Sequence, residues 1–396
     1  MFYRKFKADY LFLGDRMAEP NSVLITTAEG TVQSIVPEVE AGEDVERHRG
    51  VLSPGFVNCH CHLELSHLKG VIPEGTGLVD FLSMVIQRRG EGLQRIPEAI
   101  LSGEEEMLLQ GIVAVGDICN TTDTLGAKTA ARLKYHNFIE TVGFIEKSAA
   151  ERFAGSLRVF EAFEDALSGS NSIVPHAPYS VSPALFRRVA DFPRNRLLSV
   201  HNQENDAENE FLETGKGDFL RLYSQLGLDV SFFRGTGRRA LAAILPYFHH
   251  NQSLILVHNV ATAEEDLGDP GAAAFRPPGA PQLIFCLCPN ANLYIGGRLP
   301  DVSLFVNQNC RIVVGTDSLA SNHQLDILEE LKTLQRVFSW LETSTLLQWA
   351  TSNGASALEM DDMVGSFLPG RTPGVVLLEG LEGDRMTIGT SAKRLI

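Results

Sequence analysis

The chain of 396 residues carries 34 Lys and Arg against 49 Asp and Glu, which gives a formal net charge of −15. A chain this acidic makes a poor ligand for nucleic acid and for anionic membranes. Its 44% hydrophobic and 21% charged residues are typical of a folded globular protein and exclude a disordered one. At roughly 150 residues per domain the length allows two or three domains, although an α/β barrel takes up about 250 residues by itself.

The cysteines and the lack of long apolar segments predict a reduced, cytoplasmic protein. The chain has six cysteines, and they form no CxxC…CxxC zinc pattern. The N-terminal segment has no apolar run followed by a small-residue cleavage site, so we expect no signal peptide. The longest stretch without charged residues, 240–263, is interrupted by Pro246 and by polar residues, and we expect no membrane-spanning helix.

Both ends of the chain are rich in β-strand patterns. Runs of β-branched and apolar residues between turn residues predict the strands Ala8–Leu13, Ser22–Thr27, Thr31–Val36, Gly374–Glu379 and, more weakly, Met386–Ile388. The ends therefore differ from the middle of the chain, where strands and helices alternate.

The middle of the chain alternates short apolar runs with longer segments of helical periodicity. The runs predict the strands Val51–His60, Ile112–Cys119, Asn137–Gly143, Ser172–Pro178, Leu197–Glu204, Leu254–Val260, Leu283–Pro289 and Ile312–Asp317. Periodicity predicts helices at Glu104–Leu109, Pro183–Val189, Glu210–Leu226 and Ile327–Phe338. This alternation predicts an α/β fold, a (β/α)8 TIM barrel, with its chemistry at the carboxyl ends of the strands.

Two histidines that can bind a metal end the first run. His60 and His62 are two residues apart, so both imidazoles face the same side of a strand and can reach one ion. Cys59 and Cys61 face the other side. They are the alternative ligand pair, but the chain supplies no partners for them.

The fifth, sixth and eighth runs end in residues of the same kind. His201 ends the fifth run, and Glu204 follows at the offset expected of a general base beside a metal-activated water. Further acids follow as far as Glu213, so only the offset from His201 separates Glu204 from a solvated loop acid. His258 ends the sixth run. Asp317 ends the eighth, and a carboxylate buried there must be paired or bind a metal, because an isolated buried charge is costly.

One divalent metal ion is the cofactor that these residues predict. Three imidazoles and one carboxylate suit Zn²⁺, with Fe²⁺ and Mn²⁺ as alternatives. The predicted ligands are His60, His62, His201 and Asp317. The fourth run, at His176, contains no lysine. In two-metal hydrolases on such barrels a lysine at this strand end is carbamylated and bridges two ions, so its absence favours one ion over two.

These motifs together resemble the amidohydrolase superfamily, and within it the cytosine/guanine-deaminase-like aminohydrolases. The resemblance covers nearly the whole chain through PGFVNCHCH, PHAPYSVSP, SVHNQE, LVHNV, CPNANLYIGG and GTDSLASN, in family order. It implies a mononuclear centre with the four ligands named above, Glu204 as the proton-transfer residue, and His258 beside the attacking water and the leaving group. It also implies that His176 contacts the substrate and not the metal. Homodimers are common in this group, so the resemblance also predicts a homodimer.

The same resemblance implies a small second domain. In this family a composite β-sandwich, built from both chain ends, packs beside the barrel, and the β-rich ends of this chain match it. We therefore expect a β-sandwich of residues 1–50 and 362–396 and a catalytic barrel of residues 51–361. The closing motif departs from the family at Gly374, where Asp is common.

Within this group the form HCHLELS is similar to the aminodeoxyfutalosine deaminases, and more distantly to adenosylhomocysteine and methylthioadenosine deaminases. Glu64 in this motif is expected to bind a sugar hydroxyl or an amino-heterocycle of the substrate. A salt bridge to Lys69 is the alternative. The resemblance thus implies deamination of a small molecule, an adenine-type nucleoside such as aminodeoxyfutalosine or adenosylhomocysteine.

The expected mechanism is hydrolytic. A metal-activated water, hydrogen-bonded to Asp317, adds to the amino-bearing ring carbon, Glu204 transfers protons, and ammonia leaves. One alternative is hydrolysis of a cyclic amide, as in imidazolonepropionase, or of a chloro-triazine; another is a barrel without activity, against which the complete ligand set argues. Arg234, Arg238 and Arg239 are either surface charges or contacts to an acidic substrate group.

Overall fold

The structure is a computed structural model, and it describes residues 3–167, 169–268 and 280–396. Two four-stranded parallel sheets form its centre, in the orders β7-β8-β9-β10 and β11-β12-β13-β14. Their strands are β7 (Phe56–Cys61), β8 (Ile112–Cys119), β9 (Lys134–Thr141), β10 (Ser170–Pro175), β11 (Leu197–Asn202), β12 (Ser253–His258), β13 (Gln282–Leu287) and β14 (Ile312–Val314). Almost every residue of these strands is buried, as expected of parallel strands covered on both faces.

The two parallel sheets adjoin at both of their edges. The backbone N–H of His201 at β11 donates to the carbonyl oxygen of His176, just after β10, over 2.9 Å. At the other edge, the N–H groups of Thr316 and Asp317 after β14 donate to the carbonyl of His60 in β7, each over 3.1 Å. The carboxyl ends of strands that are far apart in the sequence therefore meet at one place.

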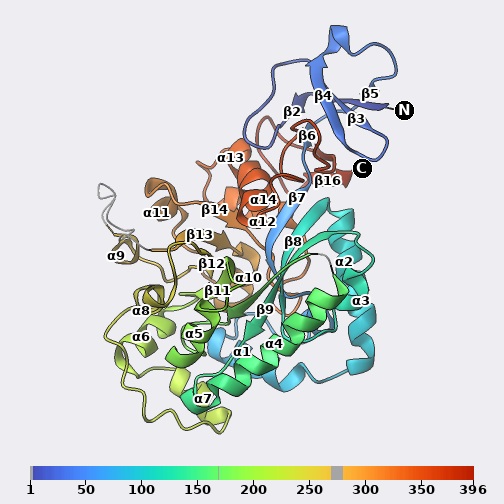
Figure 1. Ribbon diagram of the computed structural model, residues 1–396. Helices are drawn as coiled ribbons and strands as arrows, with labels where there is room; N and C mark the ends of the chain where they lie inside the picture. Colours follow the sequence, from blue (N-terminus) through green and yellow to red (C-terminus); the bar gives the residue numbers. More distant parts are fainter. Residues whose placement is uncertain (1–2, 168, 269–279) are drawn as a thin grey trace.

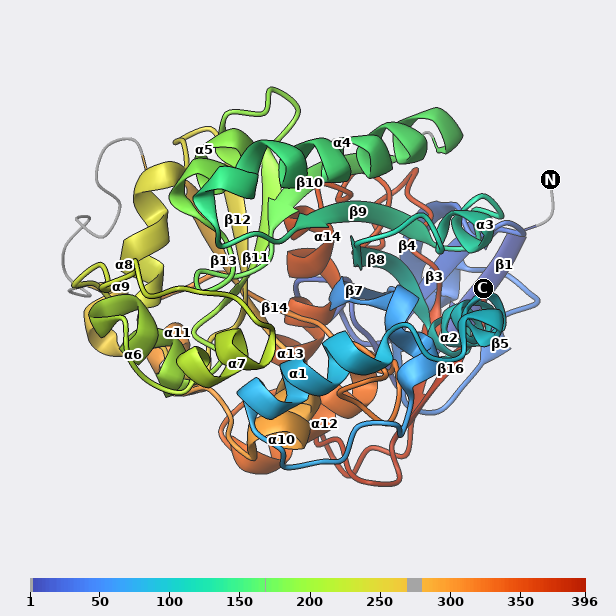
Figure 2. The ribbon, with the colours of Figure 1, turned by 90° about the horizontal axis from the view of Figure 1, so that it is seen from below.

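Helices follow the strands and lie on opposite sides of them. Figure 2 shows α4 and α5 on one side and α1, α10 and α12 on the other. The helices are α1 (Leu78–Arg88), α2 (Ile96–Leu109), α3 (Leu125–Lys128), α4 (Ala149–Ala166), α5 (Pro183–Ala190), α6 (Asp206–Thr214), α7 (Phe219–Gln225), α8 (Ala240–Ile244), α9 (Glu264–Leu267), α10 (Pro289–Gly296), α11 (Val302–Asn307), α12 (Ile327–Val337), α13 (Thr343–Gln348) and α14 (Gly354–Ala357). Within the described ranges no helix combines the length and apolar character needed to cross a membrane.

One predicted helix is divided in the structure. The periodicity over Glu210–Leu226 predicts a single helix, but α6 ends at Thr214 and α7 begins at Phe219. Gly215 and Gly217 between them have φ values of 68° and 93°, the left-handed region that ends helices and that glycine adopts without strain.

Strands from both chain ends form two further sheets, with the orders β4-β3-β1-β5 and β16-β15-β6-β2. Figure 1 shows most of these strands at one end of the molecule, beside both termini. Their bounds are β1 (Tyr3–Lys7), β2 (Tyr10–Leu11), β3 (Ser22–Thr27), β4 (Val32–Pro37), β5 (Glu46–Arg47), β6 (Val51–Ser53), β15 (Val376–Glu379) and β16 (Ser391–Arg394).

Two strand predictions are wrong in this region. The run Val51–His60 is not one strand, because Val51–Ser53 pair with β15 and β2 while the parallel strand starts only at Phe56, after Pro54 and Gly55. A strand at Met386–Ile388 is absent, and Ser391–Arg394 form β16 instead.

A buried carboxylate on α12 predicts a pH-dependent stability. Glu330 is fully buried and accepts hydrogen bonds from the backbone N–H of Asn290 and the side-chain amide of Asn322, each over 2.8 Å. Burial raises the pKa of Glu330 from 4.5 to about 8, so the folded state holds this proton more tightly than the unfolded chain. The contribution of this group is therefore intact below pH 4.5 and is lost as the pH rises to about 8.

We expect the unfolding free energy of the wild type, relative to that of Glu330→Gln, to fall across this pH range. Urea unfolding of both proteins at several pH values measures the difference. A difference that stays constant from pH 4.5 to pH 8 would contradict the assignment.

Candidate active site

His60 in β7 and His62 directly after it bring two imidazoles together at the end of the strand. The ring centroids of His60 and His62 are 4.9 Å apart, with the ring planes nearly perpendicular at 83°. Cys59 points the opposite way, where its Sγ lies 3.8 Å from the carbonyl oxygen of Gly354 in α14. This is the alternation that the sequence predicts for the strand, with the histidines together and Cys59 in the layer between strand and helix.

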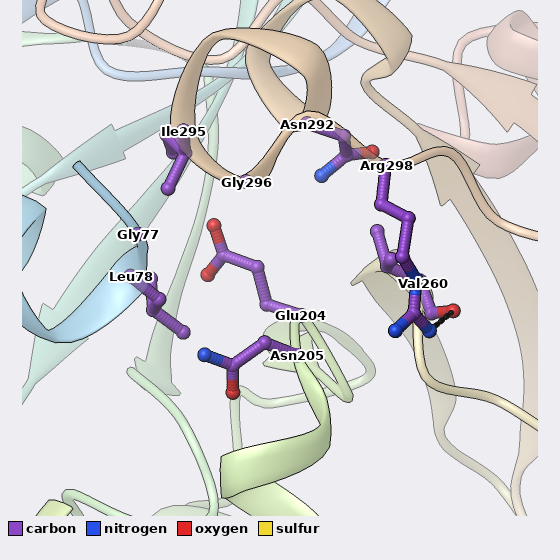
Figure 3. A pocket seen from close by; sticks show the side chains of 9 residues that line it. All are labelled: Gly77, Leu78, Glu204, Asn205, Val260, Asn292, Ile295, Gly296 and Arg298. Atoms are coloured by element: carbon purple, nitrogen blue, oxygen red, sulfur yellow. Dashed lines mark hydrogen bonds between the residues drawn. The ribbon is translucent and has the colours of Figure 1, made fainter. Parts of the chain in front are cut away.

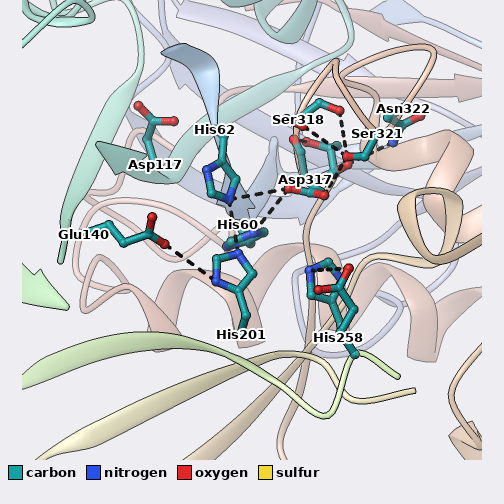
Figure 4. Close-up of polar contacts among 12 residues, drawn as sticks. His60, His62, Asp117, Glu140, His201, His258, Asp317, Ser318, Ser321 and Asn322 are labelled. Carbon is teal, nitrogen blue, oxygen red and sulfur yellow. Dashed lines mark hydrogen bonds and ion pairs between the residues drawn. The ribbon is translucent and has the colours of Figure 1, made fainter. Parts of the chain in front are cut away.

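β11 and the loop after β14 complete a cluster around these histidines (Figure 4). The Nε2 atoms of His62 and His201 are 3.2 Å apart. Asp317 Oδ1 lies 3.5 Å from His60 Nε2 and 3.6 Å from His62 Nε2. Each of His60, His62 and His201 offers one ring nitrogen, and these three nitrogens lie within 4.8 Å of one another. All four predicted ligands therefore face one point.

The chemistry of the cluster fits a divalent metal ion. His60 is fully buried, and neither of its ring nitrogens has a hydrogen-bond partner among the described residues. Burial lowers the pKa of His60 well below its usual value, and the same cause lowers the pKa of His62 and of His201. Neutral imidazoles with free lone pairs beside a carboxylate are the donors that Zn²⁺ and similar ions prefer.

Asp317 is held in its charged form and in a fixed orientation. Burial raises the pKa of Asp317, but the nearby His62 and His258 and the hydroxyl of Ser321 outweigh burial and lower it. Ser321 Oγ donates to Asp317 Oδ2 over 2.6 Å, which leaves Oδ1 turned toward the imidazoles. The backbone of Asp317 has a φ of 57°, an uncommon value for a residue other than glycine.

Glu204 and His258 stand beside this cluster. Glu204 Oε1 lies 3.7 Å from His258 Nε2, and the other ring nitrogen of His258 lies 3.0 Å from the side-chain amide nitrogen of Asn292. Burial raises the pKa of Glu204 well above its usual value, and the charges of Asp317 and Glu208 add to the effect. The backbone N–H of Glu204 donates to the Glu208 carboxylate over 3.1 Å, which fixes the start of this loop.

Two cavities meet at Glu204. The larger has a volume of about 580 Å³, enough for a nucleoside with a substituent, and its lining includes His62, His201, Glu204, His258 and Asp317. Its outer wall is apolar, with Phe81, Leu82, Val85, Phe144, Leu222 and Leu228. The smaller, of about 200 Å³, lies between Gly77 at the start of α1 and Gly296 at the end of α10 (Figure 3).

His176 lines the larger cavity without belonging to the cluster of three histidines. Its ring centroid is 4.8 Å from that of His201, and its Nδ1 lies 2.6 Å from Ser180 Oγ. Burial, and then the charge of Arg89, lower the pKa of His176 to about 4. The ring is therefore a neutral group facing the cavity.

Glu64 also lines the larger cavity, and it is paired. Arg89 in the turn after α1 donates to its Oε1 over 3.1 Å, and the backbone N–H groups of Asn120 and Thr121 donate to its Oε2 over 2.9 and 3.1 Å. Burial raises the pKa of Glu64 to about 7, although Arg89 and the two backbone N–H groups lower it. The alternative pairing with Lys69 is wrong, because Lys69 pairs with Glu106 at 3.2 Å.

The three arginines between the fifth and sixth strands do not line the larger cavity. Arg239 pairs with Asp266 at 2.8 Å, and Arg234 and Arg238 are exposed. The guanidinium groups that line this cavity belong instead to Arg89 and Arg152.

Sequence reasoning missed Arg89, Arg152, Asn120 and Glu140, all of which line the larger cavity. Glu140 had a usable signal, since it stands near the end of a predicted strand, Asn137–Gly143. Arg89 had none, because nothing near it in the sequence marks the buried Glu64 that it pairs with.

Known proteins are similar to this chain in sequence and in fold. An aminodeoxyfutalosine deaminase from Nitratiruptor sp. is 27% identical over 365 residues, which cover 89% of this chain and 85% of that protein. A 5-methylthioadenosine/S-adenosylhomocysteine deaminase from Teredinibacter turnerae is 23% identical, with 92% and 81% covered. The crystal structure of Helicobacter pylori aminofutalosine deaminase with methylthio-coformycin superposes with a TM-score of 0.82 at 20% identity, over 99% of this chain and 100% of that one. The amidohydrolase family profile matches residues 51–393, and the chain belongs to the amidohydrolase family.

Proposed function

We propose that this protein is a metal-dependent hydrolytic deaminase that releases ammonia from an adenine-type nucleoside, such as aminodeoxyfutalosine or adenosylhomocysteine. One observation carries the proposal: four side chains suited to a metal ion converge, and three of them line a cavity of about 580 Å³ together with the carboxyl of Glu204. The deaminase relatives, which match this chain over most of its length, support the reaction type.

The two parallel sheets form one closed (β/α)8 barrel in this proposal. The backbone hydrogen bonds between His201 and His176, and between Asp317 and His60, support closure at the two sheet edges. The sheets from the chain ends form a composite β-sandwich beside the barrel, with β6 extending it to Ser53. Pro54 and Gly55 then mark the boundary that the sequence placed at residue 50.

His60, His62, His201 and Asp317 hold a single divalent ion, and Zn²⁺ suits their donor atoms best. When bound, such an ion supplies the acidity that makes water a nucleophile at neutral pH. Cys59 takes no part, since it faces away from the cluster.

The side chains around the cluster then divide the proton transfers. Glu204, whose pKa burial raises, takes a proton from the attacking water and delivers it to the ring nitrogen beside the amino-bearing carbon. Asp317 Oδ1 accepts a hydrogen bond from the attacking water. His258 Nε2, 3.7 Å from Glu204 Oε1, stabilises the charge that develops on the attacking oxygen. A second proton transfer through Glu204 lets the amino group leave as ammonia.

The larger cavity holds the rest of the nucleoside. His176 and Glu64 contact the substrate, and the apolar outer wall takes the substituent on the sugar. The reduced, cytoplasmic location expected from the cysteine pattern of the sequence stays part of the proposal. The homodimer stays a prediction.

An ammonia-release screen tests the proposed function. The zinc-loaded protein is incubated with adenosine, aminodeoxyfutalosine, adenosylhomocysteine, guanine and cytosine. We expect release from one or more of the adenine nucleosides. Release from guanine or cytosine alone would contradict the nucleoside assignment. Hydrolysis of a cyclic amide or chloride release from a chloro-triazine, without ammonia, would favour the alternative reactions.

A further inference from the structure

Glu140 is a buried carboxylate that the proposed mechanism does not use. It lies next to the last residue of β9, and its side chain is 5% exposed. Asn120 Nδ2 donates to its Oε2 over 3.1 Å. Its Oε1 has no hydrogen-bond partner among the described residues. A buried acceptor without a partner is costly, which points to a donor that comes from outside the chain.

The unpartnered oxygen belongs to the wall of the larger cavity. Glu140 lines this cavity together with His176 and His201, and one ligand atom of each of these three side chains lies within 4.8 Å of the others. Figure 4 shows the Glu140 carboxylate directed toward the His201 ring. A molecule that fills the cavity thus comes within reach of Glu140.

Orienting His201 does not account for Glu140. The Nδ1 of His201 already has a partner at 2.8 Å, the carbonyl oxygen of His176, whereas Glu140 Oε1 is 3.7 Å away. A ring nitrogen carries one hydrogen, and the carbonyl is the closer and better-placed acceptor.

The position of Glu140 also excludes the reacting amino group as its donor. His201 Nε2 faces His62 and the ligand cluster at 3.2 Å, so Nδ1, and Glu140 with it, lie on the far side of that ring. Figure 4 shows His258 on the cluster side of His201, away from Glu140, and Glu204 Oε1 lies 3.7 Å from His258 Nε2, so the groups that handle the reacting atoms are on that side. A donor that meets Glu140 therefore belongs to a part of the substrate away from the amino-bearing carbon.

Glu140 is held ready for such a donor. Asn120 bridges two buried carboxylates, since its backbone N–H donates to Glu64 Oε2 over 2.9 Å and its side chain donates to Glu140. Arg89 pairs with Glu64 and not with Glu140. Glu140 therefore presents a fixed acceptor whose charge no cationic side chain pairs with, within the part of the chain that the structure describes.

We propose that Glu140 Oε1 accepts a hydrogen bond from a sugar hydroxyl of the nucleoside and so selects ribosides over their deoxy analogues. The inference rests on the proposed function, and it adds a specificity-determining residue to it. Hydroxyl groups are the donors that a nucleoside carries away from its reacting ring, and a site built to bind a hydroxyl discriminates strongly against an analogue that lacks it.

Glu140→Gln tests the inference. Its amide oxygen can accept from Asn120, which turns the amide N–H₂ toward the cavity and sets a donor against the hydroxyl. For adenosine we expect kcat/KM to fall by about 10- to 100-fold, mainly through KM. For 2′-deoxyadenosine or 3′-deoxyadenosine, whichever lacks the contacted hydroxyl, the change should stay within about threefold. Glu161→Gln, an exposed glutamate on α4, is the matched control.

Two further measurements distinguish substrate binding by Glu140 from a structural or a metal-binding role. An equal loss for adenosine and for both deoxy analogues indicates a structural role and overturns the inference. Metal analysis of both proteins should give the same content; loss of a second equivalent of metal in Glu140→Gln also overturns it, because Glu140 would then hold an ion with His176 and His201. A wild-type protein that deaminates no nucleoside overturns the proposed function itself, whereas nucleoside turnover with unchanged discrimination in the variant overturns only the assignment of Glu140.

Discussion

Glu204→Gln should lose nearly all turnover and keep its metal. The variant preserves the shape of the side chain, but an amide cannot take up and deliver a proton as the carboxyl does, and general acid–base catalysis contributes about 10²- to 10⁴-fold to a rate. None of the four ligand side chains is altered, so binding of the ion should not change. Ammonia release under saturating substrate gives kcat, and metal analysis of the same sample gives occupancy.

The control is Glu210→Gln, an exposed glutamate on α6 in the same acidic segment. It should retain wild-type kcat, because position in the segment alone does not place a carboxylate at the cavity. Near-native kcat in Glu204→Gln would show that another group transfers the proton.

Lys128→Met should destabilise the protein by about 3–5 kcal/mol, because it leaves the charge of Asp117 buried without its partner. Lys128 Nζ donates to Asp117 Oδ2 over 2.5 Å and to Asn137 Oδ1 over 2.7 Å, and the side chains of Lys128 and Asp117 are 1% and 0% exposed. Asp117 Oδ1 accepts from the backbone N–H of Leu63, the residue after His62, over 2.9 Å. The damage should therefore reach the loop that carries the metal site.

Urea unfolding of the wild type and of Lys128→Met measures the loss. The double variant Asp117→Asn with Lys128→Met should recover part of it, since the orphaned charge is gone. Lys69→Met, which breaks a pair whose lysine is 49% exposed, should cost no more than about 1 kcal/mol. A cost below about 1 kcal/mol for Lys128→Met would mean that Asp117 finds another partner or is protonated.

The sequence predicted the parts of the fold and site that depend on local pattern. The run Ile112–Cys119 agrees with β8 residue for residue, because a buried parallel strand is a nearly continuous run of apolar residues. His60, His62, His201 and Asp317 could be singled out because each is a polar residue at the end of such a run. Their convergence follows from the meeting of strand ends, which alternating strands and helices imply.

The parts that the sequence did not predict depend on contacts between distant segments. The sequence offered only the nearby Lys69 as an alternative partner for Glu64, but the partners of Glu64 are Arg89 and the backbone after β8, and only the folded chain brings these together. The apolar run around Gly55 has the pattern of a single strand. In the structure, however, its first part, Val51–Ser53, pairs with β15 near the C-terminus and is separate from β7. The same rule that found His201 applies to Glu140, but a single glutamate before Thr141 carries no motif of its own.

A titration with metal tests the central claim most directly. The protein is stripped with a chelator, dialysed, and given increasing amounts of Zn²⁺ while ammonia release from an adenine nucleoside is measured. We predict no turnover without metal, a linear rise with added Zn²⁺, and saturation at one equivalent per chain. Turnover by the metal-free protein, or saturation only at two equivalents, would contradict a single ion held by His60, His62, His201 and Asp317.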